Sequence, residues 1–103
     1  MKRFDTGRAD VTVEAKEENN FKDWCIERGL LALKLQLGTE KGFPDRTILS
    51  PGGRICFIEM KKERGGVLSV HQRRWVNQLT QFGFSVKVCA GAEEAKREIE
   101  KWW

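Results

Sequence analysis

The sequence predicts an α/β fold in which a small mixed β-sheet of about four strands is flanked by helices. Segments whose apolar residues recur at helical spacing alternate with segments typical of strands, in the order helix, three strands, helix, strand, helix. The chain has 103 residues, of which 40% are hydrophobic, and it contains four tryptophans. A chain of this size and composition builds one hydrophobic core, which excludes disorder for most of its length.

Residues 1–10 show no periodicity and mix charges of both signs with a glycine. We therefore expect a flexible arm over 1–10 and a single domain over 11–103. The chain has no apolar run approaching the ~20 residues that span a bilayer, and its first residues lack the apolar stretch of a signal peptide. A soluble, cytoplasmic protein without a membrane partner is expected.

The first helix is expected over 13–28, where apolar residues at helical spacing are followed by Gly29 as a stop signal. The next segment, 30–37, has leucine at every second position. This period-two pattern predicts a strand that turns one face toward the core. The leucines of that face are Leu31, Leu33, Leu35 and Leu37.

A polar loop over 38–42 leads to a short strand over 46–49. After a turn rich in proline and glycine, residues 54–61 are nearly continuously apolar until Glu59. Such a run is typical of a strand that is buried on both faces. We therefore expect this strand to lie centrally in the sheet.

Ser69 and Gln72 form the sequence pattern of a capping box, which predicts the start of a helix that ends at Gly83. Alternating apolar residues over 84–89 predict the last strand. A closing helix is expected over 92–103.

Nineteen basic and fifteen acidic side chains give a net charge of +4, which permits a polyanionic partner without requiring one. The three cysteines, Cys25, Cys56 and Cys89, are odd in number, widely spaced and set among apolar neighbours. This pattern argues against a disulfide framework and a zinc site, and favours buried reduced thiols. His71 is the only histidine, which excludes a multi-histidine metal centre.

Two carboxylates and a lysine are expected to converge at the end of the 54–61 strand. Glu59 and Lys61 are two residues apart and project from the same face. Pairing across the preceding turn brings Asp45, at the start of the neighbouring strand, close to Glu59. Two carboxylates with open coordination suit a hard divalent cation that also holds a phosphate. The alternative is an exposed surface ion pair without a function.

Four short motifs occur in order along the chain: Gly42-Phe43-Pro44-Asp45-Arg46, Pro51-Gly52-Gly53-Arg54, Phe57-Ile58-Glu59-Met60-Lys61 and Leu68-Ser69-x-x-Gln72. This series resembles the VRR-NUC family, the virus-type replication-repair nuclease branch of the PD-(D/E)xK superfamily. It is most similar to the stand-alone, phage-type members. The resemblance extends over about residues 12–90 and implies a core like that of the restriction endonucleases.

The resemblance implies that Asp45 and Glu59 are metal ligands, helped by the backbone carbonyl of Met60. It also implies that Lys61 positions or activates the nucleophilic water. The implied cofactor is Mg²⁺ or Mn²⁺, and no small-molecule cofactor is expected.

Gln72 matches the family's glutamine near the catalytic site, although the capping box alone accounts for a glutamine at this position. The family also has a glutamate in the first helix. Glu14 matches it best by its spacing to Gly29, and Glu17 and Glu18 are the alternatives. The general preference for acidic residues in the first turns of helices equally accounts for all three.

A basic surface around this site is expected to follow the backbone of a nucleic acid. A solvated face is the alternative for each residue, and His71 is also accounted for as an exposed residue of a helix cap. The residues of this surface are Lys41, Arg46, Lys62, Arg64, His71, Arg73 and Arg74.

The main hypothesis is a divalent-metal-dependent DNA endonuclease that hydrolyses phosphodiester bonds. The family resemblance implies a homodimer that cuts branched DNA, such as a Holliday junction, in DNA repair. It also implies a phage-encoded protein that acts in the host cytoplasm. The competing hypotheses are a non-catalytic basic DNA-binding module and a subunit of a phage DNA-processing complex whose tryptophan-bearing C-terminus docks on a partner.

Overall fold

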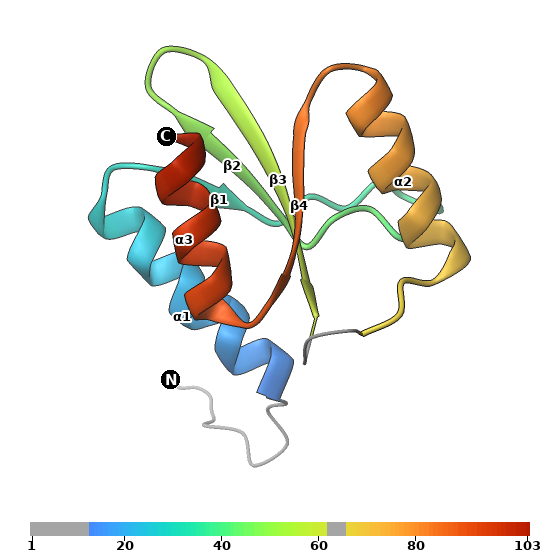
Figure 1. Ribbon diagram of the computed structural model, residues 1–103, viewed down its shortest axis with the longest axis horizontal. Helices are drawn as coiled ribbons and strands as arrows, with labels where there is room; N and C mark the ends of the chain where they lie inside the picture. Colours follow the sequence, from blue (N-terminus) through green and yellow to red (C-terminus); the bar gives the residue numbers. More distant parts are fainter. Residues whose placement is uncertain (1–12, 62–65) are drawn as a thin grey trace.

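The computed structural model of the chain describes residues 13–61 and 66–103 and has its helices and strands in the expected order (Figure 1). The arm expected over 1–10 lies outside the described residues, as do Lys62 and Arg64. Within the described part, no helix is long and apolar enough to cross a membrane. The elements are α1 (Val13–Glu27), β1 (Leu31–Leu33), β2 (Arg46–Ser50), β3 (Arg54–Lys61), α2 (Val70–Gln81), β4 (Ser85–Ala90) and α3 (Ala92–Trp102).

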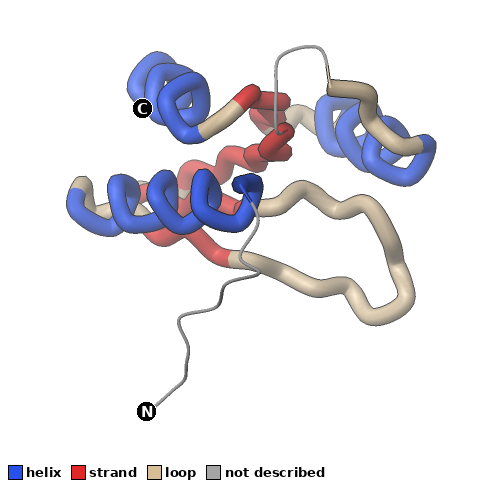
Figure 2. The backbone as a smooth tube through the Cα atoms, turned by 90° about the horizontal axis from the view of Figure 1, so that it is seen from below, coloured by secondary structure: helices blue, strands red, loops and turns tan. Residues whose placement is uncertain are grey.

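The four strands form one mixed sheet in the order β1-β2-β3-β4, which confirms the predicted fold class. The first three strands are antiparallel to one another, and β4 pairs parallel with β3. The helices α1 and α3 pack together on one face of the sheet, while α2 packs against β4 on the other face (Figure 2). One face is therefore closed by two helices, and the other is covered by a single helix over part of its width.

The main hydrophobic core lies between the sheet and the pair of helices α1 and α3. Because side chains alternate along a strand, Cys56, Ile58 and Met60 of β3 point to this face together and are buried. The helices meet them with apolar residues at helical spacing. These residues are Phe21, Cys25, Ala92, Ala95 and Ile99.

All three cysteines are free thiols within this core, as predicted. Burial raises the pKa of Cys25, Cys56 and Cys89 to about 12. The thiols are therefore protonated and inert, and they act as small apolar side chains.

A second, smaller core of aromatic rings holds α2 on the opposite face. Phe43, in the loop before β2, lies edge-on to Phe57 of β3 and to Trp75 of α2, with ring centroids 5.5 and 5.0 Å apart. Phe84, just before β4, contacts Phe57 in the same geometry at 5.5 Å. Such pairs contribute about 0.5–1.5 kcal/mol each beyond the area they bury. The rings fix α2 and the loop before β2 relative to β3.

The leucine-rich strand is shorter than expected, and its leucines face solvent. β1 comprises only Leu31–Leu33, in which Leu31 and Leu33 are 56% and 36% exposed, whereas Ala32 packs against the core. The prediction that the leucines face the core was wrong because α1 covers the Ala32 side, and α2 packs over β4 without reaching β1. The ladder with β2 ends at the pair Leu33 and Thr47, so residues 34–37 do not extend the strand.

Gly42 allows the loop before β2 to lie directly on the start of α2. Its φ is +85°, a conformation that side chains with a Cβ rarely adopt. A Cβ at this position would lie 2.5 Å from the carbonyl carbon of His71 and 2.6 Å from the amide nitrogen of Gln72. Both obstacles are backbone atoms, so a side chain at position 42 forces the loop and α2 apart.

We expect Gly42→Ala to lower the free energy of unfolding by clearly more than Gly38→Ala. Gly38 is the matched control because its φ is +62° and a Cβ there meets nothing within 4 Å. Its substitution adds only the steric strain of a Cβ in the left-handed region, which amounts to about 1–2 kcal/mol. Gly42→Ala adds this strain and also forces the loop and α2 apart. Urea denaturation of both variants measures the difference, and equal losses would contradict the close contact.

Candidate active site

Glu59 and Lys61 project from β3 on the face that α2 partly covers. The Nζ atom of Lys61 lies 3.9 Å from Oε2 of Glu59, and the Glu59 residue is only 2% exposed. This burial excludes the exposed surface ion pair that was the alternative from the sequence. A carboxylate that is buried to this extent must have polar partners, because an unpaired buried charge is costly.

Asp45 is the residue immediately before β2, and its side chain reaches the backbone of β3 between Glu59 and Lys61. Its Oδ2 atom accepts a hydrogen bond of 2.7 Å from the backbone N–H of Met60, the residue between Glu59 and Lys61. The antiparallel pairing of β2 and β3 produces this position. Arg46 lies opposite Ile58 in the ladder, so Asp45, the residue before Arg46, lies next to Glu59, the residue after Ile58. The convergence of Asp45, Glu59 and Lys61 expected from the sequence is therefore present.

Gln72 of α2 joins the carboxylate to the lysine. Its side-chain Nε2 donates to Oε2 of Glu59 at 2.9 Å, and its Oε1 accepts from Nζ of Lys61 at 2.9 Å. The same Oε1 accepts from the backbone N–H of Ser69 at 2.9 Å, and the Ser69 hydroxyl accepts from the N–H of Gln72 at 3.1 Å. The capping box is thus confirmed, and the same glutamine contacts the carboxylate and the lysine.

The surroundings of Glu59 disfavour its negative charge. The pKa of Glu59 is raised to about 8, chiefly by burial and next by the nearby charge of Asp45. The positive charge of Lys61 opposes this shift, whereas a hydrogen bond with Asp45 and the charge of Glu18 add to it. Two carboxylates that disfavour each other's charge are stabilised by a bound cation.

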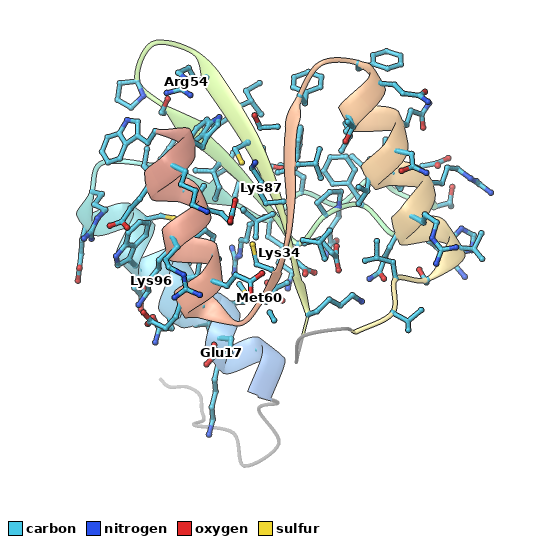
Figure 3. The ribbon with its side chains drawn as sticks, viewed as in Figure 1. Glu17, Lys34, Arg54, Met60, Lys87 and Lys96 are labelled. Carbon is cyan, nitrogen blue, oxygen red and sulfur yellow. The ribbon has the colours of Figure 1, made fainter. Side chains whose placement is uncertain are left out.

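The three glutamates of α1 have different places. Glu17, labelled in Figure 3, reaches the start of α3, where its Oε1 accepts from the N–H of Ala92 at 2.6 Å. Glu18 pairs with Arg46, and its charge adds to the upward shift of the Glu59 pKa. The side chain of Glu14 lies outside the described part, so its role as a metal ligand stays a prediction. Glu17, by contrast, is occupied in capping α3.

Arg46 points away from the surface, on the face of the sheet that α1 covers. It is 7% exposed, its Nε lies 3.5 Å from Oε1 of Glu18, and a guanidinium N–H donates to the carbonyl of Ala32 at 3.4 Å. This geometry ties α1 to β1 and β2 and corrects the expected contact of Arg46 with DNA. The remaining described members of the basic surface are exposed, namely Lys41, His71, Arg73 and Arg74.

The carboxylates present fit a hard divalent cation with few protein ligands. No group of three or more metal-ligating side chains gathers within the described part of the chain. Asp45 and Glu59 supply two carboxylates side by side, and Mg²⁺ is commonly bound through one or two carboxylates while it keeps several waters. The backbone carbonyl of Met60, the third expected ligand, belongs to the same stretch of β3.

The raised pKa of Glu59 predicts a specific pH dependence of stability in the metal-free protein. The carboxyl group has an ordinary pKa of 4.5 and a pKa of about 8 in the folded state. The folded state therefore binds the proton more tightly, so its stabilising contribution is complete below the lower value and is lost as the pH rises through the higher one.

We expect the free energy of unfolding in EDTA to fall from about pH 6 to about pH 9 by more in the wild type than in Glu59→Gln. Glutamine has the same shape as protonated glutamate but does not titrate in this range. Urea denaturation at both pH values measures the difference. Parallel changes in the two proteins would show that Glu59 does not carry the raised pKa.

Comparisons with known proteins place the chain in a family. The family model of the VRR-NUC domain matches residues 11–93. A solved structure described as a VRR_NUC domain is similar over 89% of this chain and 99% of its own, with a TM-score of 0.82 and 27% identity. Another, described as a VRR_NUC domain protein, covers 88% of both chains with a TM-score of 0.73 and 16% identity, which shows the shared fold. No curated protein matches. The chain belongs to the VRR-NUC family and contains a nuclease domain of the PD-(D/E)xK type.

Proposed function

We propose that this protein is a divalent-metal-dependent DNA endonuclease that hydrolyses phosphodiester bonds at the site of Asp45, Glu59, Lys61 and Gln72. The observation that carries the proposal is the convergence of two carboxylates and a lysine on one glutamine side chain. A nuclease domain implies a nucleic-acid substrate, and the net charge of +4 suits the phosphate backbone of DNA.

Each residue of the site has a distinct role in this proposal. Asp45 and Glu59 hold Mg²⁺ or Mn²⁺, which when bound supplies Lewis-acid stabilisation of charge at phosphorus and lowers the pKa of a water molecule. Lys61 orients the attacking water, and Gln72 holds the Lys61 ammonium group by a 2.9 Å hydrogen bond. The Ser69 N–H fixes the orientation of the Gln72 amide, because it donates to the same oxygen. Glu14 adds a further acid from α1.

Branched DNA and a homodimeric assembly form the second part of the proposal. A single small domain contacts few base pairs, so DNA shape and backbone position contribute more than sequence. The half of the sheet face that α2 leaves uncovered is apolar and suits a second copy of this chain. Leu31 is 56% exposed there, and a hollow of about 430 Å³ is lined by residues that include Leu31, Leu49, Pro51 and Ile55. Two copies bring two sites to the symmetric strands of a Holliday junction.

Cleavage assays test the catalytic part. Labelled four-way junction, flap and linear duplex DNA are incubated with Mn²⁺ and the wild type, Lys61→Ala or Lys101→Ala. Lys101 is the matched control because it is an exposed lysine of α3 that pairs only with Glu98 among the described residues. We expect the Lys61 variant to lose activity by about 100-fold or more, and the control to match the wild type.

In the same assay, we expect EDTA to abolish cutting and the junction to be cut in preference to the duplex. Cutting that survives Lys61→Ala would remove the lysine from the mechanism. A wild type that binds Mn²⁺ and DNA but cuts no substrate would favour the non-catalytic binding module or a subunit that needs a phage partner.

Sedimentation tests the assembly. We expect the wild type to sediment as a dimer and Leu33→Glu to sediment as a folded monomer, because a charge on the exposed leucine face opposes burial against a second copy. A wild-type monomer at micromolar concentration would contradict the homodimer. A cytoplasmic site of action in a phage-infected host stays a prediction from the sequence.

A further inference from the structure

A polar cavity of about 250 Å³ lies between the loop before β2 and the first turns of α2. Its walls come from two segments that are far apart in the sequence and lie on the side of the molecule away from α1 and α3 (Figure 2). None of the side chains of the candidate active site lines it. The lining residues are Thr39, Glu40, Lys41, His71, Arg74 and Trp75.

The cavity is a fixed part of the fold, built by the same contacts that position Gln72. Gly42 lies against the backbone of His71 and Gln72 with no room for a Cβ. One residue further along the loop, Phe43 packs edge-on to Trp75 with ring centroids 5.0 Å apart. The loop wall and the helix wall are therefore held together at both of these points. His71 is adjacent to Gln72 in the chain, so the cavity and the candidate site share the first turn of α2.

The charges around the cavity are suited to an anion. Lys41 and Arg74 contribute two positive charges, His71 adds nitrogen donors, and Glu40 is the single carboxylate of the lining. Within residues 13–61 and 66–103, neither Lys41 nor Arg74 forms an ion pair with a carboxylate. On α3, by contrast, Lys96 and Lys101 pair with acidic neighbours one turn away. Two cations that line one polar cavity suit the oxygens of a phosphate group.

We propose that this cavity is a subsite for one backbone phosphate of the DNA strand that is cut, with Lys41 and Arg74 as the phosphate contacts. The inference rests on the proposed nuclease function and extends it. A cavity of about 250 Å³ has room for a phosphate group with bridging water, since one water occupies about 30 Å³ of liquid. A phosphate held here sets which neighbouring phosphodiester lies at Asp45 and Glu59.

A phosphate held in a cavity has a different signature from a general basic surface. A surface attracts every phosphate equally, so the loss of one charge weakens binding to all strands alike. A subsite holds one phosphate at one position from the cut. Removing the charge of that phosphate and removing the charge of Arg74 then disrupt the same interaction. The combined loss of affinity is smaller than the sum of the two separate losses, and a double-mutant cycle measures this difference.

The experiment uses single neutral methylphosphonate linkages, placed one at a time along the labelled strand around the cut. Binding is measured with Ca²⁺ in place of Mn²⁺ for the wild type, Arg74→Gln, Lys41→Gln and Arg97→Gln. Arg97 is the matched control because it is an exposed arginine on α3, the helix on the opposite face of the sheet. Substrates with and without a 5′-terminal phosphate form a separate arm.

We expect one position at which the methylphosphonate weakens wild-type binding by about tenfold and weakens Arg74→Gln binding by clearly less, because only the Lys41 contact is then left to lose. The Arg74 and Lys41 variants each reduce the slope of log affinity against log salt by about 1. The Arg97 variant reproduces the wild-type profile at every position.

Three results overturn the subsite. Additive effects of Arg74→Gln and the methylphosphonate at all positions would mean that the cavity holds no defined phosphate. Coupling of Arg74 to the 5′-terminal phosphate alone would mean that it recognises a strand end. A wild type that neither binds nor cuts DNA contradicts the proposed function itself, whereas a wild type that cuts DNA while Arg74→Gln behaves like Arg97→Gln contradicts only the subsite.

Discussion

The Gln72 side chain, which donates to Glu59 and accepts from Lys61, is the interaction on which the rest of the site depends. A carboxylate that is 2% exposed is stable only when its oxygens have partners. An amide supplies a donor to the carboxylate and an acceptor to the ammonium group at once, but only in one orientation. The Ser69 N–H selects that orientation because it donates to the same amide oxygen as Lys61. The start of a helix thereby becomes part of the geometry of the candidate site.

The two faces of the sheet have different roles: one carries the hydrophobic core and the other carries the candidate site. The face toward α1 and α3 holds the apolar core, and there Arg46 and Glu18 tie the first helix to the sheet. The other face carries Asp45, Glu59 and Lys61, with α2 held above it by the aromatic rings of Phe43, Phe57, Trp75 and Phe84. Because the strand alternates, one element serves both faces, so β3 builds the core with every second residue and the site with the others.

Local patterns predicted much of the fold and the convergence of Asp45, Glu59 and Lys61, because the hairpin is encoded over a short distance. The capping box predicted the start of the helix that carries Gln72, whereas the place of Gln72 beside the site came from the family resemblance. Strand β1 shows the limit of such patterns. The alternation of its leucines predicts a strand with two faces but does not show which face a helix covers. The burial of Arg46 could not be predicted from the sequence either, because arginine is usually exposed. It depends on the folded positions of Glu18 and Ala32, which contact the guanidinium group. The close contact of Gly42 with α2 joins segments about thirty residues apart, and only the folded chain shows it.

We infer that Asp45 and Glu59 form a cation site in which burial holds Glu59 protonated until the metal binds. Calorimetric titration of Mn²⁺ into the protein, repeated in buffers of different ionisation enthalpy, counts the protons released on binding. With a Glu59 pKa of about 8, we expect release of close to one proton at about pH 6.5 and almost none at about pH 9.5. We also expect Glu59→Gln to release no proton. Binding without proton release at the lower pH, or an unchanged release in that variant, would mean that Glu59 is not a protonated ligand of the cation.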